Sequence, residues 1–397
     1  MPRDLVILAD DLTGACDSAA PFGRTVSPAV VFVSPVAMLA PAANAVAYST
    51  NTRSQDGPVA RRIVGELAAR VARPEMLLIK KVDSTLLGNI GYEVDAVLDA
   101  LPRSMAVVAT AFPAMGRQVV EGRVRVAGRA LERDIRELVR DHTGGICHTI
   151  PLCVVRGGDV VLTHVLERQF AEGARWVVVD GECDADLDVV ARSLKQLTFN
   201  ALPVVSGGLT AALARQMVLP GRVDVSQLCA DASATRGVVA FVGSANAVTQ
   251  AQIAEAVRHE NILLLDLNDM SALETASALR EGRHVVIRVG WQPSDRAHID
   301  AVARVCISGA VAGVIATGGD TAQLVCSAIS CTFLQLEDEV VPGIAQSRCG
   351  DGLLRNSPFI TKAGGFGEAN AIVQSIQHLR RLATFRQPIT SPRSTLS

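Results

Sequence analysis

The chain has 397 residues, 49% hydrophobic and 20% charged, which is long enough for two packed domains. Its formal net charge of −2 lacks the basic excess of a nucleic-acid-binding protein. No apolar run reaches membrane-spanning length, and none resembles a signal peptide. The nine scattered cysteines form no CxxC pair, so we expect reduced thiols and a cytoplasmic protein rather than a disulfide framework or a zinc site.

The first predicted strand, residues 5–9, stops at two adjacent acids, Asp10 and Asp11, and a helix-like segment follows. This pattern indicates a buried parallel strand that leads into a helix. Ligands of open α/β sheets bind beyond the carboxyl ends of the strands, where adjacent carboxylates need a cation, a metal or substrate hydroxyls. The alternative is that one of the acids, or Thr13, only caps the helix.

Similar strand-like runs follow, and most of them end in polar or glycine-rich clusters. In the first half the predicted strands are residues 45–48, 76–79, 105–108, 176–179 and 203–205, and the predicted helices are 59–71, 91–101 and 187–197. A second series of strands comprises residues 238–242, 262–265, 285–287, 314–315, 333–341 and 359–360, with a helix-like segment at 322–329. Strands that alternate with helices predict an α/β fold with parallel sheets.

Small and polar residues prevail at 228–236, between the two series, and indicate a domain boundary near residue 232. We therefore predict two domains, residues 1–232 and 233–382, followed by a disordered tail at 383–397. Each domain is expected to be a largely parallel sheet flanked by helices, with the active site in the cleft between the domains.

Acids, hydroxyls and cations gather at the strand ends of the first half. Carboxylates and Asn51 suit sugar hydroxyls, and the planar fork of Arg53 suits a carboxylate. Only four lysines occur in the chain, and two of them open the motif KKVDS at Lys80. The candidate ligand contacts are Asp10, Asp11, Asn51, Arg53, Lys81, Asp83 and Ser84. They predict a small, anionic, polyhydroxylated ligand, whereas the alternative for KKVD is an ordinary surface ion pair.

Glycine-rich turns end the strands of the second half: GSAN at 243–246, TGGDT at 317–321, Pro342-Gly343, and KAGGFG at 362–367. Such turns at helix N-termini bind phosphate through backbone N–H groups, although a single Gly-Gly pair usually marks only a turn. The chain contains no Gly-Lys dipeptide and no GxGxxG after a strand, which excludes a P-loop protein and a standard dinucleotide fold.

Taken in order, ADDLTGA at 9–15, NTRS at 51–54, KKVDSTLLGN at 80–89, AFPAMGR at 111–117, TGGDT and KAGGFG make a specific combination. In these motifs the chain resembles the four-carbon acid-sugar kinases. The resemblance implies phosphorylation of a tetronate such as threonate, erythronate or 3-oxo-tetronate by ATP, with the acid sugar in the first domain and the nucleotide in the second. Two positions depart from the family pattern: Leu87 replaces an arginine, and Asn246 replaces a serine.

The resemblance also implies roles for single residues. Substrate contacts are expected from Asp10 or Asp11, from Arg53, and from Lys81, Val82, Asp83 and Ser84. Nucleotide contacts are expected from Gly243, Ser244, Thr317, Gly318, Gly319, Asp320, Gly343, Lys362, Gly364 and Gly365. We expect Mg²⁺ on the phosphates with Asp320 as its ligand, and Asp11 or Asp83 as the group that takes the acceptor proton.

A homodimer is also expected. Two other functions stay open from the sequence. One is a sugar-acid and nucleotide sensor or decayed kinase, which the replacements at Leu87 and Asn246 motivate. The other is an oxidoreductase with an unusual nucleotide site.

Overall fold

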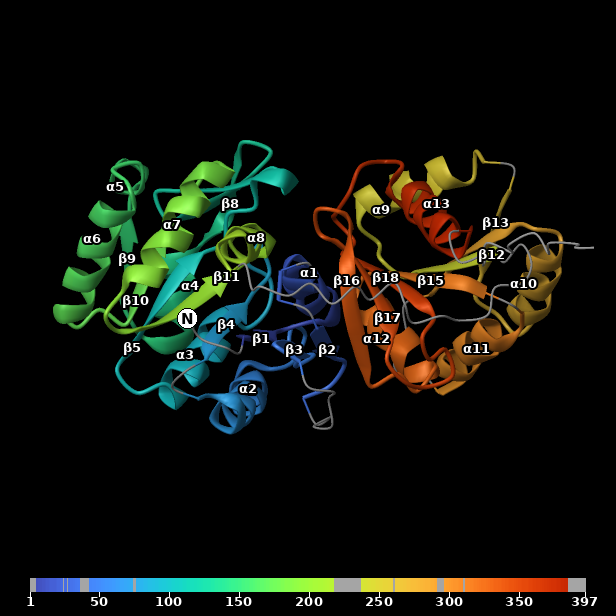
Figure 1. Cartoon of the computed structure of the whole chain (residues 1–397), viewed down its shortest axis with the longest axis horizontal. Helices are drawn as coiled ribbons and strands as arrows, with labels where there is room; N and C mark the ends of the chain where they lie inside the picture. The colour runs from blue at the N-terminus through green and yellow to red at the C-terminus, as the bar shows by residue number, and fades with distance from the viewer. Residues whose placement is uncertain are drawn as a thin grey trace, which may run out of the picture.

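The computed structural model describes residues 5–23, 25–26, 28–35, 43–73, 76–217, 237–259, 261–290, 296–309 and 311–384. Two lobes lie side by side (Figure 1), an N-terminal lobe of residues 5–217 and a C-terminal lobe of residues 237–384. The predicted boundary near residue 232 lies outside the described residues. Of the predicted tail, residues 383 and 384 belong to the last helix, and the rest also lies outside the described residues.

Parallel strands of the N-terminal lobe follow the order β2-β3-β1-β4-β11-β5-β10-β9. Their bounds are β1 Leu5–Ala9, β2 Ala29–Phe32, β3 Ala45–Ser49, β4 Leu77–Lys81, β5 Ser104–Ala109, β9 Cys147–Ile150, β10 Trp176–Val179 and β11 Asn200–Val205. Most of their residues are buried, as expected for a parallel sheet between two layers of helices. The helices form two such layers. In one layer α3 packs on α2 and α4, and in the other α8 packs on α1 and α7, which in turn packs on α6.

The helices of this lobe are α1 Leu12–Gly23, α2 Gly57–Val71, α3 Ile90–Ala100, α4 Ile135–Thr143, α5 Leu152–Val155, α6 Asp159–Ala171, α7 Asp184–Gln196 and α8 Gly207–Gln216. An additional small sheet was not predicted. It consists of the antiparallel strands β6 Arg117–Val120, β7 Arg123–Val126 and β8 Arg129–Asp134, and the short 3-10 helix η1 Pro113–Met115 precedes it. This sheet begins at Arg117, directly after the motif residues 111–116.

The C-terminal lobe continues the same sheet in the order β13-β14-β12-β15-β18-β17-β16. Its strands are β12 Gly237–Val242, β13 Ile262–Asp266, β14 His284–Arg288, β15 Val311–Thr317, β16 Phe333–Val341, β17 Ile344–Cys349 and β18 Pro358–Lys362. Its helices are α9 Ala247–Ala256, α10 Ser271–Arg280, α11 Arg296–Ile307, α12 Gly319–Ala328 and α13 Ala371–Thr384. The predicted α/β class with two largely parallel sets of strands is confirmed.

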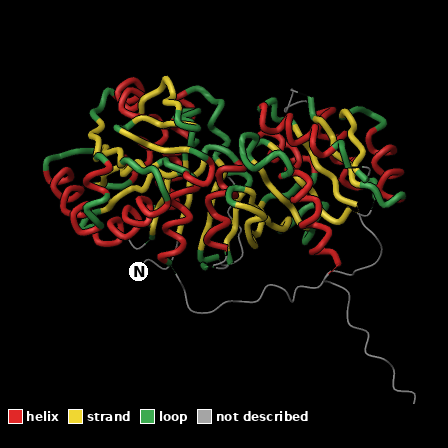
Figure 2. The backbone as a smooth tube through the Cα atoms, turned by 90° about the horizontal axis from the view of Figure 1, so that it is seen from above, coloured by secondary structure: helices red, strands yellow, loops and turns green. Residues whose placement is uncertain are grey.

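The two sets of strands form one 15-stranded sheet, which the sequence did not predict. Strand β16 pairs antiparallel with β2, and Phe333 lies opposite Phe32. Each strand thereby covers an edge that would otherwise be open. Figure 2 shows the two lobes from above, with helices and strands continuing across the join. None of the helices in the described part of the chain is long and apolar enough to cross a membrane.

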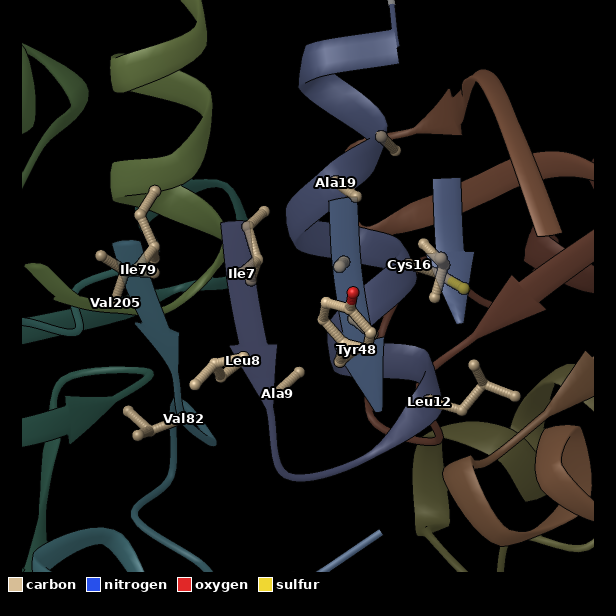
Figure 3. Packing of buried hydrophobic residues seen from close by; sticks show 14 of the residues in the cluster. Ile7, Leu8, Ala9, Leu12, Cys16, Ala19, Tyr48, Ile79, Val82 and Val205 are labelled. Atoms are coloured by element: carbon tan, nitrogen blue, oxygen red, sulfur yellow. The ribbon is translucent and has the colours of Figure 1, made fainter. Parts of the chain in front are cut away.

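Helix α1 lies at the join of the two lobes (Figure 1). It packs on β1 and β3 of its own lobe and on β16, β17, β18 and α12 of the other. Small buried residues, Ala15, Cys16 and Ala19, allow this close packing, and Figure 3 shows Cys16 and Ala19 on α1 near the strands of the N-terminal lobe. One hydrophobic core therefore runs through both lobes and fixes the start of α1, where the paired acids lie.

Candidate functional site

A cavity of about 310 Å³ lies between the lobes, at the carboxyl ends of strands from both. Ten of the predicted site residues line it: Asp11, Arg53, Asp83, Gly243, Ser244, Gly318, Gly319, Asp320, Gly364 and Gly365. Acids and arginines of the N-terminal lobe thus face the glycine-rich turns of the C-terminal lobe across one space. This is the arrangement that an interdomain active site requires.

The guanidinium of Arg53 holds the paired acids together. Its Nε and Nη2 donate to Asp10 at 2.7 and 2.8 Å, and its Nη1 and Nη2 donate to Asp11 at 2.9 and 3.0 Å. Burial alone would raise the pKa of Asp10, but the charge and hydrogen bonds of Arg53 outweigh it and lower that pKa to about 2. The sequence analysis predicted that the Arg53 fork would hold a ligand carboxylate. In the structure the protein's own carboxylates already occupy it.

Asp11 caps a helix and lines the cavity as well. Its Oδ1 accepts from the backbone N–H of Gly14 at 2.8 Å, and its Oδ2 accepts from the Thr13 hydroxyl at 2.7 Å. The bond to Gly14 is an N-cap for α1. With the two bonds from Arg53, both oxygens of Asp11 accept hydrogen bonds. Asp11 is therefore both a helix cap and a residue of the cavity wall, the two alternatives that the sequence left open.

Asp83 lines the cavity, and its hydrogen bonds go to one of its two oxygens. Its Oδ2 accepts from the Thr85 backbone N–H at 2.8 Å, from the Thr85 hydroxyl, and from the Leu87 N–H at 3.3 Å. Its Oδ1 lies 3.9 Å from Nη1 of Arg53. Because the loop fixes one side of this carboxylate, the other side is held in a defined direction.

The other predicted residues of the N-terminal lobe do not line the cavity. Asn51 is exposed and has a left-handed φ of 52°. Val82 is a core residue, and Ser84 is buried. Lys81 is buried 3.6 Å from Asp17, whose pKa burial raises to about 6 although Lys81 opposes the shift. These four residues, like Asp10, do not line the cavity.

The motif TGGDT places the N-terminus of α12 at the cavity. Gly318 has a φ of 102°, which favours glycine, and precedes the first helical residue, Gly319. Thr317, the last residue of β15, is buried and does not line the cavity. The N–H of Gly318 donates to the Lys362 carbonyl at 2.8 Å, and the N–H groups of the first helical turn after it are suited to bind an anion.

Two further segments of the C-terminal lobe meet beside this turn. Ser244 follows β12, and a β-carbon added to Gly364 would lie only 2.1 Å from its Oγ. Asn246, one of the departures from the family pattern, accepts from the Val248 N–H at 2.9 Å and so caps α9. Asparagine and serine are equally good N-caps, which gives this replacement a physical reason.

Lys362 is completely buried beneath the KAGGFG loop and does not line the cavity. Its Nζ donates to the backbone carbonyls of Ala363, Gly364 and Phe366, at 2.9, 3.3 and 3.1 Å. Burial lowers the pKa of this lysine to about 7. Gly343, with a φ of 78°, also lies outside the wall, and a β-carbon there would collide with the ring of Phe366. Both residues fix the loop instead of facing the cavity.

Arg117 was missed as a site residue. It lines the cavity, is 8% exposed, donates from Nη1 to Ser84 Oγ at 2.8 Å, and lies over the ring of Phe366 at 4.8 Å. The signal was present, because AFPAMGR was one of the motifs of the resemblance. Nothing in the sequence pattern places this arginine near Ser84.

Asp320, the candidate metal ligand, is exposed on the cavity wall. Its partial desolvation and the charge of Asp11 raise its pKa. In the described residues no three His, Cys, Asp or Glu side chains gather closely enough to hold a metal ion by themselves. A Mg²⁺ ion needs only one or two protein carboxylates when nucleotide phosphates supply further oxygens, so Asp320 fits such an ion.

Comparison with known proteins agrees with the division into two lobes. A sugar-binding N-terminal domain matches residues 5–213, and a nucleotide-binding C-terminal domain matches residues 239–372. A D-threonate kinase of Bordetella bronchiseptica is 32% identical, covering 94% of this chain and 97% of the relative. A D-erythronate kinase of Heliobacterium modesticaldum is 28% identical over 95% of this chain and 97% of its own length.

A 3-oxo-tetronate kinase of Methylobacterium radiotolerans is 27% identical, covering 93% of this chain and 98% of the relative. Among solved structures, one from Salmonella typhimurium has the same fold, with a TM-score of 0.74 and 21% identity over 94% of this chain and 99% of that chain. The matches thus extend through both lobes.

Proposed function

Since the chain belongs to the family of four-carbon acid-sugar kinases, we propose that it transfers the γ-phosphate of ATP to a hydroxyl group of a tetronate. The observation that carries the proposal is the shared cavity: the acids of the N-terminal lobe and the glycine-rich turns of the C-terminal lobe line the same space. Phosphoryl transfer depends mainly on such positioning and on charge stabilisation.

The nucleotide phosphates are assigned to the C-terminal wall. Gly318 and Gly319 present the N-terminus of α12, and Ser244, Gly364 and Gly365 line the cavity beside it. Backbone N–H groups at such a site donate to phosphate oxygens, and the helix dipole favours their negative charge. Lys362 supports this wall by fixing the carbonyls of the loop from below.

The acceptor hydroxyl is assigned to the N-terminal wall, with Asp83 as the group that takes its proton. Asp11 and Asp83 were both candidates. Both oxygens of Asp11 are engaged by Arg53, Thr13 and Gly14, whereas Oδ1 of Asp83 has no donor closer than the 3.9 Å contact with Arg53 among the described residues. A base needs a free lone pair directed at the reacting hydroxyl, which favours Asp83.

We further infer that Asp320, with Asp11 close by, holds the Mg²⁺ that accompanies ATP. When bound, this ion neutralises charge on the phosphates. The support is that Asp320 and Asp11 line the same cavity as the glycine-rich turns assigned to the phosphates. The protein's own contribution is to hold the two walls at a fixed separation.

The test is ADP formation by the purified chain with D-threonate, D-erythronate and 3-oxo-tetronate, each with Mg-ATP. The proposal expects one of these acids to raise ADP formation well above the rate without acceptor, with one phosphate ester formed per ADP. Tight binding of an acid without turnover would instead identify a sensor. Equal ATP consumption with and without every acid would contradict the proposal.

A further inference from the structure

Arg117 is a cation of the cavity wall that lacks a carboxylate partner. In the described part of the chain, no Asp or Glu oxygen forms an ion pair with it within 4.0 Å, and its Nε is buried without a hydrogen-bond partner. The other arginine of the wall, Arg53, is neutralised by Asp10 and Asp11. Arg117 is therefore the arginine of this wall without a close carboxylate partner, although the more distant charges of Asp83 and Asp17 favour its charged form.

The guanidinium of Arg117 is held in one orientation. Its Nη1 donates to Ser84, and one of its faces lies on the ring of Phe366, which in turn packs edge-on against Phe112 at 5.6 Å. Since Arg117 is also the first residue of β6, its backbone belongs to a sheet. Because Nε is buried, an anion would meet this fixed guanidinium at its Nη groups.

A buried charge without a counterion is costly, so such a group is normally paired in the functional state. Burial also lowers the pKa of Arg117. On this basis we propose that Arg117 binds the carboxylate of the acid sugar and selects acids over neutral polyols. The inference rests on the proposed function, because it assumes that the acid sugar occupies this wall.

The position of Arg117 favours the substrate carboxylate over a phosphate. Its hydrogen-bond partner, Ser84, directly follows Asp83, the proposed base, so Arg117 lies beside the acceptor. Asp11 and Asp83 on the same wall repel an approaching carboxylate, which makes a compensating cation necessary. Phosphates, in contrast, already have N–H donors at the start of α12.

The test compares Arg117→Gln and Arg117→Lys with the wild-type chain. Binding of D-threonate and D-erythronate is measured by calorimetry without ATP, and transfer is measured with each acid and with threitol or erythritol, which lack the carboxylate. For Arg117→Gln we expect acid affinity to fall by about 100-fold. We expect transfer to the tetritol to fall much less than transfer to the acid, so that the preference for the acid decreases. Arg117→Lys keeps the charge without the fork and is expected to lose less.

Arg129→Gln is the matched control, because Arg129 is exposed on β8 of the same small sheet and does not line the cavity. Unchanged acid binding by Arg117→Gln would overturn the proposal. Equal losses with acid and tetritol would also overturn it and would assign Arg117 to the phosphate, since Nη2 lies 3.5 Å from where a β-carbon of Gly365 would be. If the wild-type chain binds an acid but transfers no phosphate, the kinase proposal fails while the binding comparison still tests Arg117.

Discussion

Gly319 of the C-terminal lobe lies directly against Asp11 of the N-terminal lobe. A β-carbon at residue 319 would be 2.5 Å from Oδ2 of Asp11, closer than non-bonded atoms approach. The turn assigned to the nucleotide and the acids assigned to the sugar therefore touch at this point. Together with the continuous sheet, this contact sets the distance between the two ligands.

Gly319→Ala is expected to reduce kcat by about 100-fold, because a displacement of about 1 Å in the reacting groups has an effect of that size. Asp11 cannot move aside easily, since Arg53, Thr13 and Gly14 all hold it. Steady-state kinetics with Mg-ATP and the preferred acid measure the effect. Gly65→Ala is the control, because a β-carbon there makes only an ordinary 3.5 Å contact, with Ala96 of α3. A fully active Gly319→Ala would contradict the assigned contact.

Asp83→Asn is expected to lower kcat by roughly 1000-fold, the contribution of a positioned base, while ATP binds as before. Asparagine retains an acceptor oxygen for the Thr85 hydroxyl but cannot take a proton. Rapid-quench kinetics and ATP calorimetry separate the two effects. Asp188→Asn, at a surface acid paired with Arg215, serves as control. Near-normal turnover by Asp83→Asn would remove Asp83 as the base.

Asp10 gives the protein a pH-dependent stability. Its folded-state pKa of about 2 lies below the ordinary 3.8, so the stabilisation is present above pH 4 and is lost as the pH falls toward 2. The free energy of unfolding of the wild type exceeds that of Asp10→Asn by an amount that should shrink by about 2 kcal/mol between pH 5 and pH 2.5. Urea unfolding measures it, with Asp56→Asn at an exposed acid as control. A difference that does not change with pH would argue against the assigned ion pair.

Lys362 also makes stability rise with pH, but in a higher pH range than Asp10. Its pKa of about 7 lies below the ordinary 10.5, so above pH 7 the unfolded chain binds more protons than the folded one, and stability rises with pH. From pH 7 to pH 9 the wild type should gain about 2 kcal/mol of unfolding free energy relative to Lys362→Met. The exposed Lys195 supplies the control Lys195→Met, for which no such gain is expected. Parallel pH curves for wild type and Lys362→Met would show that this lysine is not desolvated.

Asn246 offers a test of the departure from the family pattern. Asn246→Ser should leave stability unchanged, whereas Asn246→Ala should lose about 1 kcal/mol, because alanine cannot accept the N–H of Val248. Thermal unfolding measures both variants. An equal loss in the serine variant would show that the asparagine has a role other than capping.

Strand ends could be predicted from the sequence because apolar runs that stop at acids or glycines mark them directly. Asp11, Asp83 and residues 318–320 therefore came out on the cavity wall. The pairing of β16 with β2 could not be predicted, since no local pattern records which edges meet. The predicted homodimer and the domain boundary near residue 232 stay predictions.

The hydrogen-bond and ion-pair partners of the charged side chains could not be predicted from the sequence. Arg53 was expected to face a ligand, but Asp10 and Asp11 bind it. Lys80 is buried with its Nζ 2.7 Å from Glu93, a contact between residues thirteen positions apart that only the fold brings together. Arg117 reaches Ser84 through a small sheet whose short strands gave no periodic signal.

The central claim is that one cavity holds both ligands, and a crystal structure with a non-hydrolysable ATP analogue, Mg²⁺ and D-threonate or D-erythronate tests it most directly. The account predicts phosphates at residues 318–320 and the acid beside Asp83, with one of its hydroxyls facing the γ-phosphate. A nucleotide bound outside the space between Asp83 and Gly319 would contradict it.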